Sequence, residues 1–227
     1  SLFLLMPLLG IATSGVNDYP EGLESLSEVS YTHSSSSMNE PGFQEGSIFS
    51  ESTLALGDQL TCGIFNHSVY CVGNNNYGQL GYTSGNSNEI NVTPQKIDLG
   101  PSAVVTSVTA GYAHACAILD NSSLYCWGRN NYGQLGDGWD GNWSTQPTQS
   151  HVPVEVILPP GRVPIEVSAF GYHTCSILHN ASVYCWGRNT NGQLGRGYGG
   201  FDNYAQWTPQ PMLLPEGRGA IAVSLGS

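Results

Sequence analysis

The stretch HACAILDNSSLYCWGRNNYGQLGDG, residues 114–138, carries two cysteines ten positions apart on either side of a short polar segment. Residues 120–122, Asp-Asn-Ser, have the side chains that commonly connect two strands in a turn. A hairpin that turns there brings Cys116 opposite Cys126. Directly opposed residues on antiparallel strands have α-carbons about 4.5–5.5 Å apart, which is within the range of a disulfide. The stretch therefore predicts a hairpin whose two arms are joined by a disulfide.

Two further copies of this stretch occur in the chain. Segments 55–81 and 168–195 align with segment 109–136, and each contains a cysteine pair followed by Gly-Gln-Leu-Gly. The Gly-Gln-Leu-Gly blocks recur with periods of 55 and 59 residues, and they begin at Gly78, Gly133 and Gly192. Repetition at this period is typical of solenoids, arrays and propellers. The short β-branched runs, with many glycines and prolines between them, favour strands over helices.

Six cysteines allow many pairings, but one local pairing repeats with the unit. It joins Cys62 to Cys71, Cys116 to Cys126, and Cys175 to Cys185. Each bridge closes a short loop and is expected to stabilise the folded state by about 2–3 kcal/mol. The alternative is a metal site in which a histidine, such as His114 or His173, joins each cysteine pair. No Cys-x-x-Cys knuckle is present and the first unit has Leu60 in place of the histidine, so no metal is expected.

At these residues the sequence resembles the regulator of chromosome condensation (RCC1) repeat family, in particular its cysteine-paired version found in secreted or microbial proteins. The resemblance is carried by Ala110-Gly111, His114, Cys116 and the run LYCWGRNNYGQLGDG, with their counterparts in the other units. It implies an all-β fold, the seven-bladed β-propeller whose blades are four-stranded antiparallel sheets. Seven such units would need roughly 390 residues. We therefore expect about three blades of a probable seven, in a chain that is a fragment.

The composition divides the chain into three parts. Residues 1–15 contain an apolar run followed by small residues, which is typical of the end of a signal peptide. The alternatives are a buried strand or a short anchor, and the run is too short for a stable membrane span. Residues 16–51 are acidic and serine-rich and are expected to form a flexible leader. Residues 52–227 hold the RCC1-like repeats, with blades expected at 52–108, 109–167 and 168–219 and the start of a fourth at 220–227.

Charge and cysteine content limit the partner and the compartment. The formal net charge of −11 would repel phosphate backbones, so nucleic acid is not expected as a partner. Disulfides persist in oxidising compartments, so a secreted, extracellular or cell-surface location is expected. Five Asn-x-Ser/Thr sequons are candidate glycosylation sites, unless Asn- and Ser-rich turns produce them by chance: Asn66, Asn91, Asn121, Asn142 and Asn180.

The variable part of each unit follows Gly-Gln-Leu-Gly. In the second and third units it is rich in aromatic residues with polar neighbours, a composition that suits a protein or glycan partner. The alternative is that these rings pack back on their own blade. The candidate binding-loop residues are Trp139, Asp140, Trp143, Tyr198, Phe201, Tyr204 and Trp207.

No catalytic motif stands out in the sequence, and the repeating His114 and His173 are interpreted as structural residues that bond a neighbouring strand or blade. We expect a non-catalytic protein without a cofactor that serves as a protein- or glycan-binding scaffold. Two alternatives remain. One is guanine-nucleotide exchange on a small GTPase with chromatin binding, which is the role of the family's founding member. The other is inhibition of an enzyme by a secreted propeller.

Overall fold

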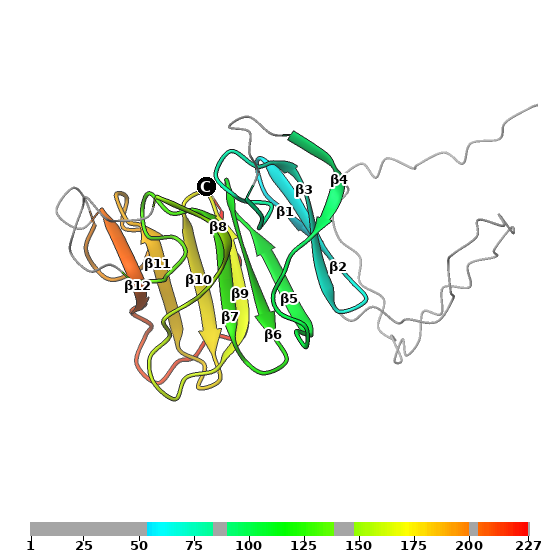
Figure 1. Cartoon of the computed structure of the whole chain (residues 1–227). Coiled ribbons are helices and arrows are strands. Elements are labelled where there is room, and N and C mark those ends of the chain that lie inside the picture. The colour runs from blue at the N-terminus through cyan, green and yellow to red at the C-terminus, as the bar shows by residue number, and fades with distance from the viewer. Residues whose placement is uncertain (1–53, 84–89, 139–147, 200–203, 227) are drawn as a thin grey trace, which may run out of the picture. The chain divides into compact units, whose positions relative to one another are not determined.

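The computed structural model describes residues 54–83, 90–138, 148–199 and 204–226. The expected signal peptide and leader lie outside these residues. All regular structure in the described residues is β, in three four-stranded antiparallel sheets that follow one another along the chain (Figure 1). The strands are β1 (Leu54–Leu56), β2 (Leu60–Phe65), β3 (Ser68–Asn74), β4 (Ile90–Lys96), β5 (Val105–Ala110), β6 (His114–Leu119), β7 (Leu124–Arg129), β8 (Gln149–Glu155), β9 (Pro164–Phe170), β10 (His173–Leu178), β11 (Val183–Arg188) and β12 (Ala205–Pro211).

The predicted hairpins are confirmed as the central pair of strands in each sheet. Cys62 faces Cys71 between β2 and β3, and the pairs in the other two sheets face each other in the same way. Their sulfur atoms are bonded at 2.04, 2.10 and 2.10 Å, and no cysteine is left free. Asn66 and His67 both have positive φ, 47° and 60°, as a two-residue type I′ turn requires. Because every cysteine sulfur is bonded to another cysteine sulfur, no thiolate is present to bind the metal ion of the alternative site.

The sheets begin earlier than the expected blade boundaries at 109 and 168. β5 starts at Val105 and β9 at Pro164, because each of these strands pairs with the hairpin that follows it. The segment after β12 lies against the third sheet, where the backbone amide of Leu225 donates to Ser168 Oγ at 3.1 Å. The amide of Ala169 in the third sheet donates to Thr109 of the second sheet in the same way, at 2.9 Å.

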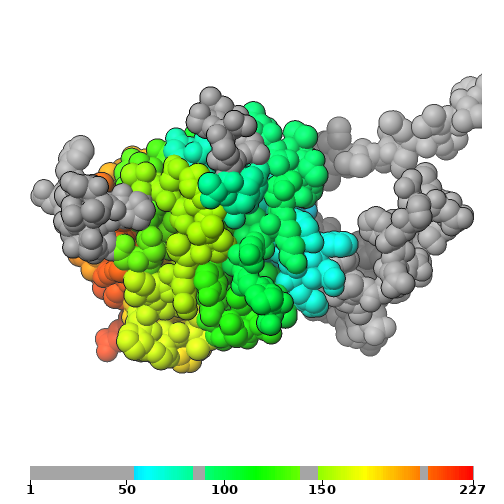
Figure 2. Space-filling model, in the orientation of Figure 1, coloured from blue at the N-terminus to red at the C-terminus, as the bar shows by residue number. Residues whose placement is uncertain are grey.

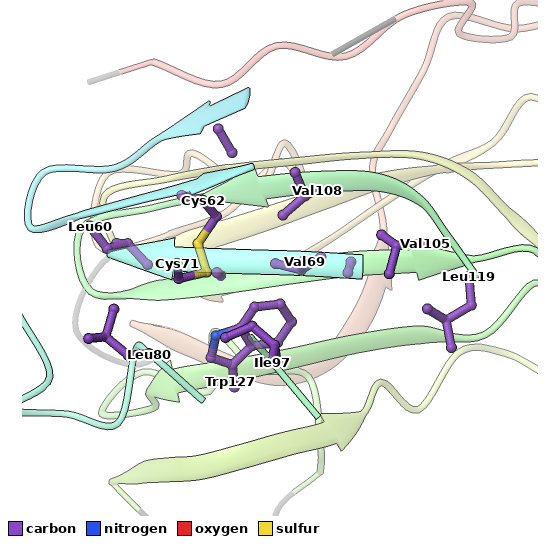
Figure 3. Close-up of a cluster of buried hydrophobic side chains, with 14 residues drawn as sticks. Leu60, Cys62, Val69, Cys71, Leu80, Ile97, Val105, Val108, Leu119 and Trp127 are labelled. Atoms are coloured by element: carbon purple, nitrogen blue, oxygen red, sulfur yellow. A yellow bond between two sulfur atoms is a disulfide. The ribbon is translucent and has the colours of Figure 1, made fainter. Parts of the chain in front are cut away.

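Neighbouring sheets pack through the tryptophan that follows the second cysteine. The side chain of Trp127 is fully buried among Leu80, Ile97 and Cys71 of the first sheet (Figure 3). Trp186 is likewise fully buried, in the cluster that joins the second and third sheets. Successive sheets therefore share apolar cores, and in the space-filling view the colours pass from cyan through green and yellow to orange in chain order (Figure 2). The predicted packing role of both tryptophans is confirmed.

The order of strands gives each sheet two different ends. Antiparallel strands alternate in direction, so the loops from first to second and from third to fourth strand share one end, which we call the loop face. The cysteine hairpin turns and the connections between sheets share the other end, the hairpin face. The first strands β1, β5 and β9 contact one another in turn. The described ends of the variable segments in all three units therefore lie on the loop face.

Candidate binding face

A buried asparagine organises each Gly-Gln-Leu-Gly loop. The Oδ1 atoms of Asn75, Asn130 and Asn189 accept hydrogen bonds from the backbone amides of the leucines five residues later, at 2.9, 3.1 and 3.1 Å. All three asparagine side chains are at most 1% exposed. The leucines, at positions 80, 135 and 194, are completely buried, as the sequence predicted. The asparagine Oδ1 thus takes the place of a backbone carbonyl as the acceptor and holds the loop in its conformation.

The same asparagines hold the start of each variable segment. Their Nδ2 atoms donate to the backbone oxygens of Tyr82 and Tyr198, and in the second unit to Oδ1 of Asp137 at 3.0 Å. Burial raises the pKa of Asp137 above its usual value, although the bond from Asn130 opposes that rise. Each variable segment therefore leaves the sheet from a fixed point.

A polar chain of hydrogen bonds joins the second and third sheets beneath these loops. His114 Nε2 lies 2.9 Å from Thr174 Oγ1, and Thr174 Oγ1 lies 3.0 Å from the backbone oxygen of Gln134. The threonine hydroxyl has one proton, which it gives to Gln134, so His114 must donate from Nε2. Trp186 Nε1 donates to the same Gln134 oxygen at 2.9 Å. The predicted role of His114 in bonding a neighbouring blade is confirmed.

His114 is neutral in this setting. Its complete burial, together with the nearby His173, lowers its pKa to about 3. Burial also lowers the pKa of His173. A proton on Nδ1 of His114 would find no acceptor, because that atom is buried without a partner in the described structure. Both histidines therefore act as structural residues and are poorly suited to proton transfer at neutral pH.

Tyrosines from the second and third sheets form a continuous row on the loop face. The ring centroids of Tyr112 and Tyr172 are 5.1 Å apart, and those of Tyr172 and Tyr132 are 5.3 Å apart. Tyr204 meets Tyr132 edge-on at 6.3 Å. Gln59 of the first sheet donates from Nε2 to the Tyr112 hydroxyl at 2.9 Å. Because tilted and edge-on ring pairs are mutually stabilising, the row is a preformed surface.

The guanidinium groups of two arginines contact the rings of this row. The Arg129 guanidinium carbon lies 4.5 Å from the ring centroid of Tyr77 and 5.0 Å from that of Tyr172. Arg188 lies 5.6 Å from the centroid of Tyr132. These distances are typical of cation–π contacts. We call the set the tyrosine–arginine band, and its members are Tyr77, Tyr112, Arg129, Tyr132, Tyr172, Arg188 and Tyr204.

The predicted binding-loop residues are only partly described. Trp139, Asp140, Trp143 and Phe201 lie outside the described residues. Tyr198 is 42% exposed, with Arg196 stacked 4.8 Å from its ring centroid. Tyr204 belongs to the band, and burial together with Tyr132 raises its pKa. Trp207 packs against Gly133, where a Cβ atom would lie 2.6 Å from the tryptophan Cα. Tyr204 and Trp207 therefore contact the preceding sheet, whereas the alternative in the sequence analysis placed such rings on their own blade.

The sequons divide between the two faces. Asn66, Asn121 and Asn180 are exposed at the hairpin turns, on the hairpin face. Asn91 is partly buried on the loop-face side of its sheet and donates from Nδ2 to the Tyr82 hydroxyl at 3.1 Å. Asn142 lies outside the described residues. Glycans on the three hairpin turns would leave the tyrosine–arginine band uncovered.

Two further features of the described residues concern metal binding and the membrane. No group of three or more His, Cys, Asp or Glu side chains within them is placed to hold a metal ion. The part of the chain that the structure describes also contains no helical segment that could span a bilayer.

The chain is similar in sequence to several curated proteins. The chain is 31% identical to the ultraviolet-B receptor UVR8 of Arabidopsis thaliana over 64% of its own length and 31% of the receptor. It is 29% identical to the RCC1 domain-containing protein RUG3 of the same plant, over 82% of this chain and 40% of that protein. It also matches human HERC6, a probable E3 ubiquitin-protein ligase, over only 15% of that protein. The chain thus spans less than half the length of these relatives.

Solved structures show the same fold. Prp20p of Saccharomyces cerevisiae superposes with a TM-score of 0.62 at 19% identity, over 71% of this chain and 38% of that chain. Human WBSCR16 superposes with a TM-score of 0.58 at 22% identity, over 72% of this chain and 42% of that chain. The three sheets are therefore blades of a β-propeller, as the sequence predicted.

Profiles of the repeat itself complete the assignment. The profile described as the regulator of chromosome condensation (RCC1) repeat matches residues 66–118, 121–177 and 180–227, and a second profile of the same description matches 105–134 and 165–193. Each match of the first profile starts at or near a cysteine hairpin turn and covers the Gly-Gln-Leu-Gly loop that follows it. The first two matches end in the second strand of the next sheet, β6 or β10. The chain belongs to the RCC1 repeat family.

Proposed function

We propose that this protein is a non-catalytic scaffold of the RCC1 type that binds a partner protein through its loop face. The observation that carries the proposal is the contrast between a fixed support and variable segments. Disulfides, buried asparagines and tryptophan contacts between sheets recur in the repeats, whereas the segments between Gly-Gln-Leu-Gly and the fourth strand differ in length and sequence. Loops on a rigid support are the usual place for recognition.

A protein partner is favoured over a glycan by the residues on this face. Tyrosine and arginine are enriched in the parts of protein interfaces that contribute most to affinity. Prp20p, which shares the fold, is described as binding Gsp1p and histones. Its identity to this chain is 19%, so the fold supports a scaffold without indicating the same partner.

We also propose that the protein works in an oxidising compartment, secreted or at the cell surface. The three disulfides, each fully or almost fully buried in a sheet, support this location because such bonds persist outside the cytosol. Fractionation of cells that express the full reading frame would test it. Protein in the medium or on the surface, with all thiols oxidised, is expected. A nuclear pool with reduced thiols would overturn the proposal.

Site-specific photocrosslinking would test the binding function. A photoreactive amino acid replaces Tyr198 on the loop face or, as the matched control, Asp120 on the hairpin face. We expect a discrete crosslinked protein from the Tyr198 position alone, identified by mass spectrometry and reproduced with the purified partner. Equal crosslinking from both positions, or none from Tyr198, would contradict the proposal.

A further inference from the structure

We propose that the tyrosine–arginine band binds an acidic segment of the partner protein, with Arg129 and Arg188 each holding a carboxylate. The inference rests on the proposed scaffold function and deepens it, because it assigns the site and the chemistry of the partner. It is carried by the way the two guanidinium groups are held.

Arg129 is held by contacts with two tyrosine rings and by a hydrogen bond from its inner nitrogen. Its guanidinium group lies between the rings of Tyr77 and Tyr172, and Nε donates to Asn131 Oδ1 at 2.8 Å. One terminal nitrogen, Nη1, reaches the Tyr172 hydroxyl at 3.4 Å, a long contact. Since a guanidinium group has five N–H donors, most of its outer edge has no acceptor among the described residues. That edge has the shape that binds a carboxylate through two parallel hydrogen bonds.

Arg188 repeats this arrangement one blade later. Its guanidinium group stacks on Tyr132, and its Nε donates to Thr190 Oγ1 at 2.9 Å. No described residue accepts from its two terminal nitrogens. In both arginines the residue two positions further along the chain, Asn131 or Thr190, is the acceptor that orients the group. Two preoriented guanidinium groups on adjacent blades therefore lie on the same face of the protein, the loop face.

The charge balance makes the arrangement unusual for this chain. The whole chain has six Lys and Arg residues against 17 Asp and Glu. Seven of these acidic residues lie in the described structure, and none of the seven is paired with a band arginine. The described acidic residues of the loop face are Asp58, which is exposed, and Asp137, which accepts from Asn130. A carboxylate from outside would therefore supply the missing acceptors.

The same balance favours a short acidic segment over a nucleic acid. A polyphosphate would meet the repulsion of a net charge of −11 along its length. Two or three carboxylates can instead be bound locally, while the tyrosine rings between the arginines contact the apolar atoms of the same peptide. Because the arginine side chains are already ordered, little side-chain entropy is lost on binding.

Fluorescence polarisation with a defined probe would test the inference. The probe is the fluorescein-labelled peptide Gly-Glu-Tyr-Glu-Gly-Glu-Glu-Gly, compared with its counterpart in which every Glu is Gln. The intact disulfide-bonded chain should bind the Glu peptide at least about tenfold more tightly, and salt should weaken this binding. Equal binding of the two peptides would overturn the inference.

Matched variants separate the site from the overall charge. The double variant Arg129→Gln/Arg188→Gln should weaken binding of the Glu peptide by about tenfold or more, because charge-assisted hydrogen bonds are lost. The control Arg162→Gln/Arg218→Gln removes the same charge from exposed positions in the connections on the hairpin face and should change binding by less than about twofold, since exposed distant charges are screened. Arg129→Lys retains the charge but not the fork, and should bind at an intermediate strength. Equal losses in both double variants would overturn the inference.

The photocrosslinking assay distinguishes this inference from the scaffold proposal. Thermal unfolding and the mass of the unreduced protein first establish that the double variant is folded. If the folded Arg129→Gln/Arg188→Gln chain captures the partner as well as the wild type does, the inference is wrong and the scaffold function stands. If the wild type captures no partner, the scaffold function itself fails, whatever the peptide result.

Discussion

The indole nitrogen of Trp186 and the backbone oxygen of Gln134 are 2.9 Å apart across the junction between the second and third blades. Trp127 and Gln79 form the same bond at 3.0 Å between the first and second blades. The two junctions differ in the number of hydrogen bonds that this backbone oxygen accepts. Thr174 donates a second hydrogen bond to Gln134, whereas Ala115 occupies the corresponding position at the earlier junction.

This difference predicts unequal effects of one substitution. Trp127→Phe removes the side chain that donates to the backbone oxygen of Gln79 and leaves that buried oxygen unsatisfied. Trp186→Phe removes one donor to the backbone oxygen of Gln134 but leaves the hydrogen bond from Thr174 in place. The volume lost is the same in both variants. We expect Trp127→Phe to lower the free energy of unfolding by about 1 kcal/mol more than Trp186→Phe. Urea unfolding would measure both values, and an equal or reversed order would show that the hydrogen bond does not govern the difference.

Removal of one disulfide should destabilise its own blade. The pair Cys116–Cys126 closes a separation of ten residues and is completely buried. Cys116→Ala/Cys126→Ala should cost about 2–3 kcal/mol of unfolding free energy by the loop-entropy estimate. Urea unfolding of this variant and of the wild type would measure the cost. A loss well under 1 kcal/mol would mean that the rest of the blade already restricts the unfolded hairpin.

The glycine after each tryptophan is required by a close backbone approach. Gly128 has φ +101°, and a Cβ atom there would lie 2.5 Å from the backbone oxygen of Ala113. Gly161 has φ +71° with nothing within 4 Å of the corresponding position, so it serves as a matched control for backbone strain alone. Gly161→Ala should cost about 1 kcal/mol and Gly128→Ala clearly more, on the order of 3 kcal/mol. Thermal unfolding would compare them, and equal costs would exclude the steric explanation.

The sequence predicted those parts of the fold that are determined by residues recurring from one unit to the next. The cysteine hairpins and the buried leucines recur in all three units, and the buried tryptophans recur in the second and third. Contacts close in the sequence determine the roles of most of these residues. Asn75, Asn130 and Asn189 were missed although each stands three residues before Gly-Gln-Leu-Gly, because asparagine near glycine is commonly interpreted as a turn residue. Their recurrence was a usable signal.

The tyrosine–arginine band could not have been predicted in the same way. Its residues also recur, but the band exists only because a tyrosine of one blade meets a ring or a guanidinium group of the next. These distances depend on how the sheets pack against each other, which the period of the sequence does not specify. Trp207 was placed in a binding loop for a similar reason, since its contact with Gly133 belongs to the junction between blades.

The two faces should differ in glycosylation when the chain is produced in a eukaryotic secretory host. Asn121 is exposed at a hairpin turn, whereas the Asn91 side chain is engaged with the hydroxyl of Tyr82. We expect a glycan on Asn121 and none on Asn91, because the acceptor amide must be accessible. The variants Asn121→Gln and Asn91→Gln, compared by mass before and after enzymatic deglycosylation, would measure this. A glycan on Asn91 alone would show that the loop face is the more accessible one.

Stability should fall in mild acid because of His114. Its pKa is about 3 in the folded protein, below the ordinary value of 6.5, so between these pH values the unfolded chain binds a proton that the folded chain does not. The stability that His114 contributes is therefore present above pH 6.5 and is lost as the pH falls toward 3. His173, whose pKa is also lowered, acts in the same direction, whereas the raised pKa of Asp137 opposes it.

The substitution His114→Gln isolates this contribution. Glutamine has an amide that can donate to Thr174 and does not titrate, so the variant should lose less stability than the wild type between pH 7 and pH 4.5, by on the order of 2 kcal/mol. The exposed His67 at the first hairpin turn provides the matched control, as His67→Asn, which should retain the wild-type dependence. Urea unfolding at several pH values would measure all three proteins. If His114→Gln and the wild type lose stability in parallel, the buried histidine at this blade junction is not the group that makes the propeller sensitive to acid.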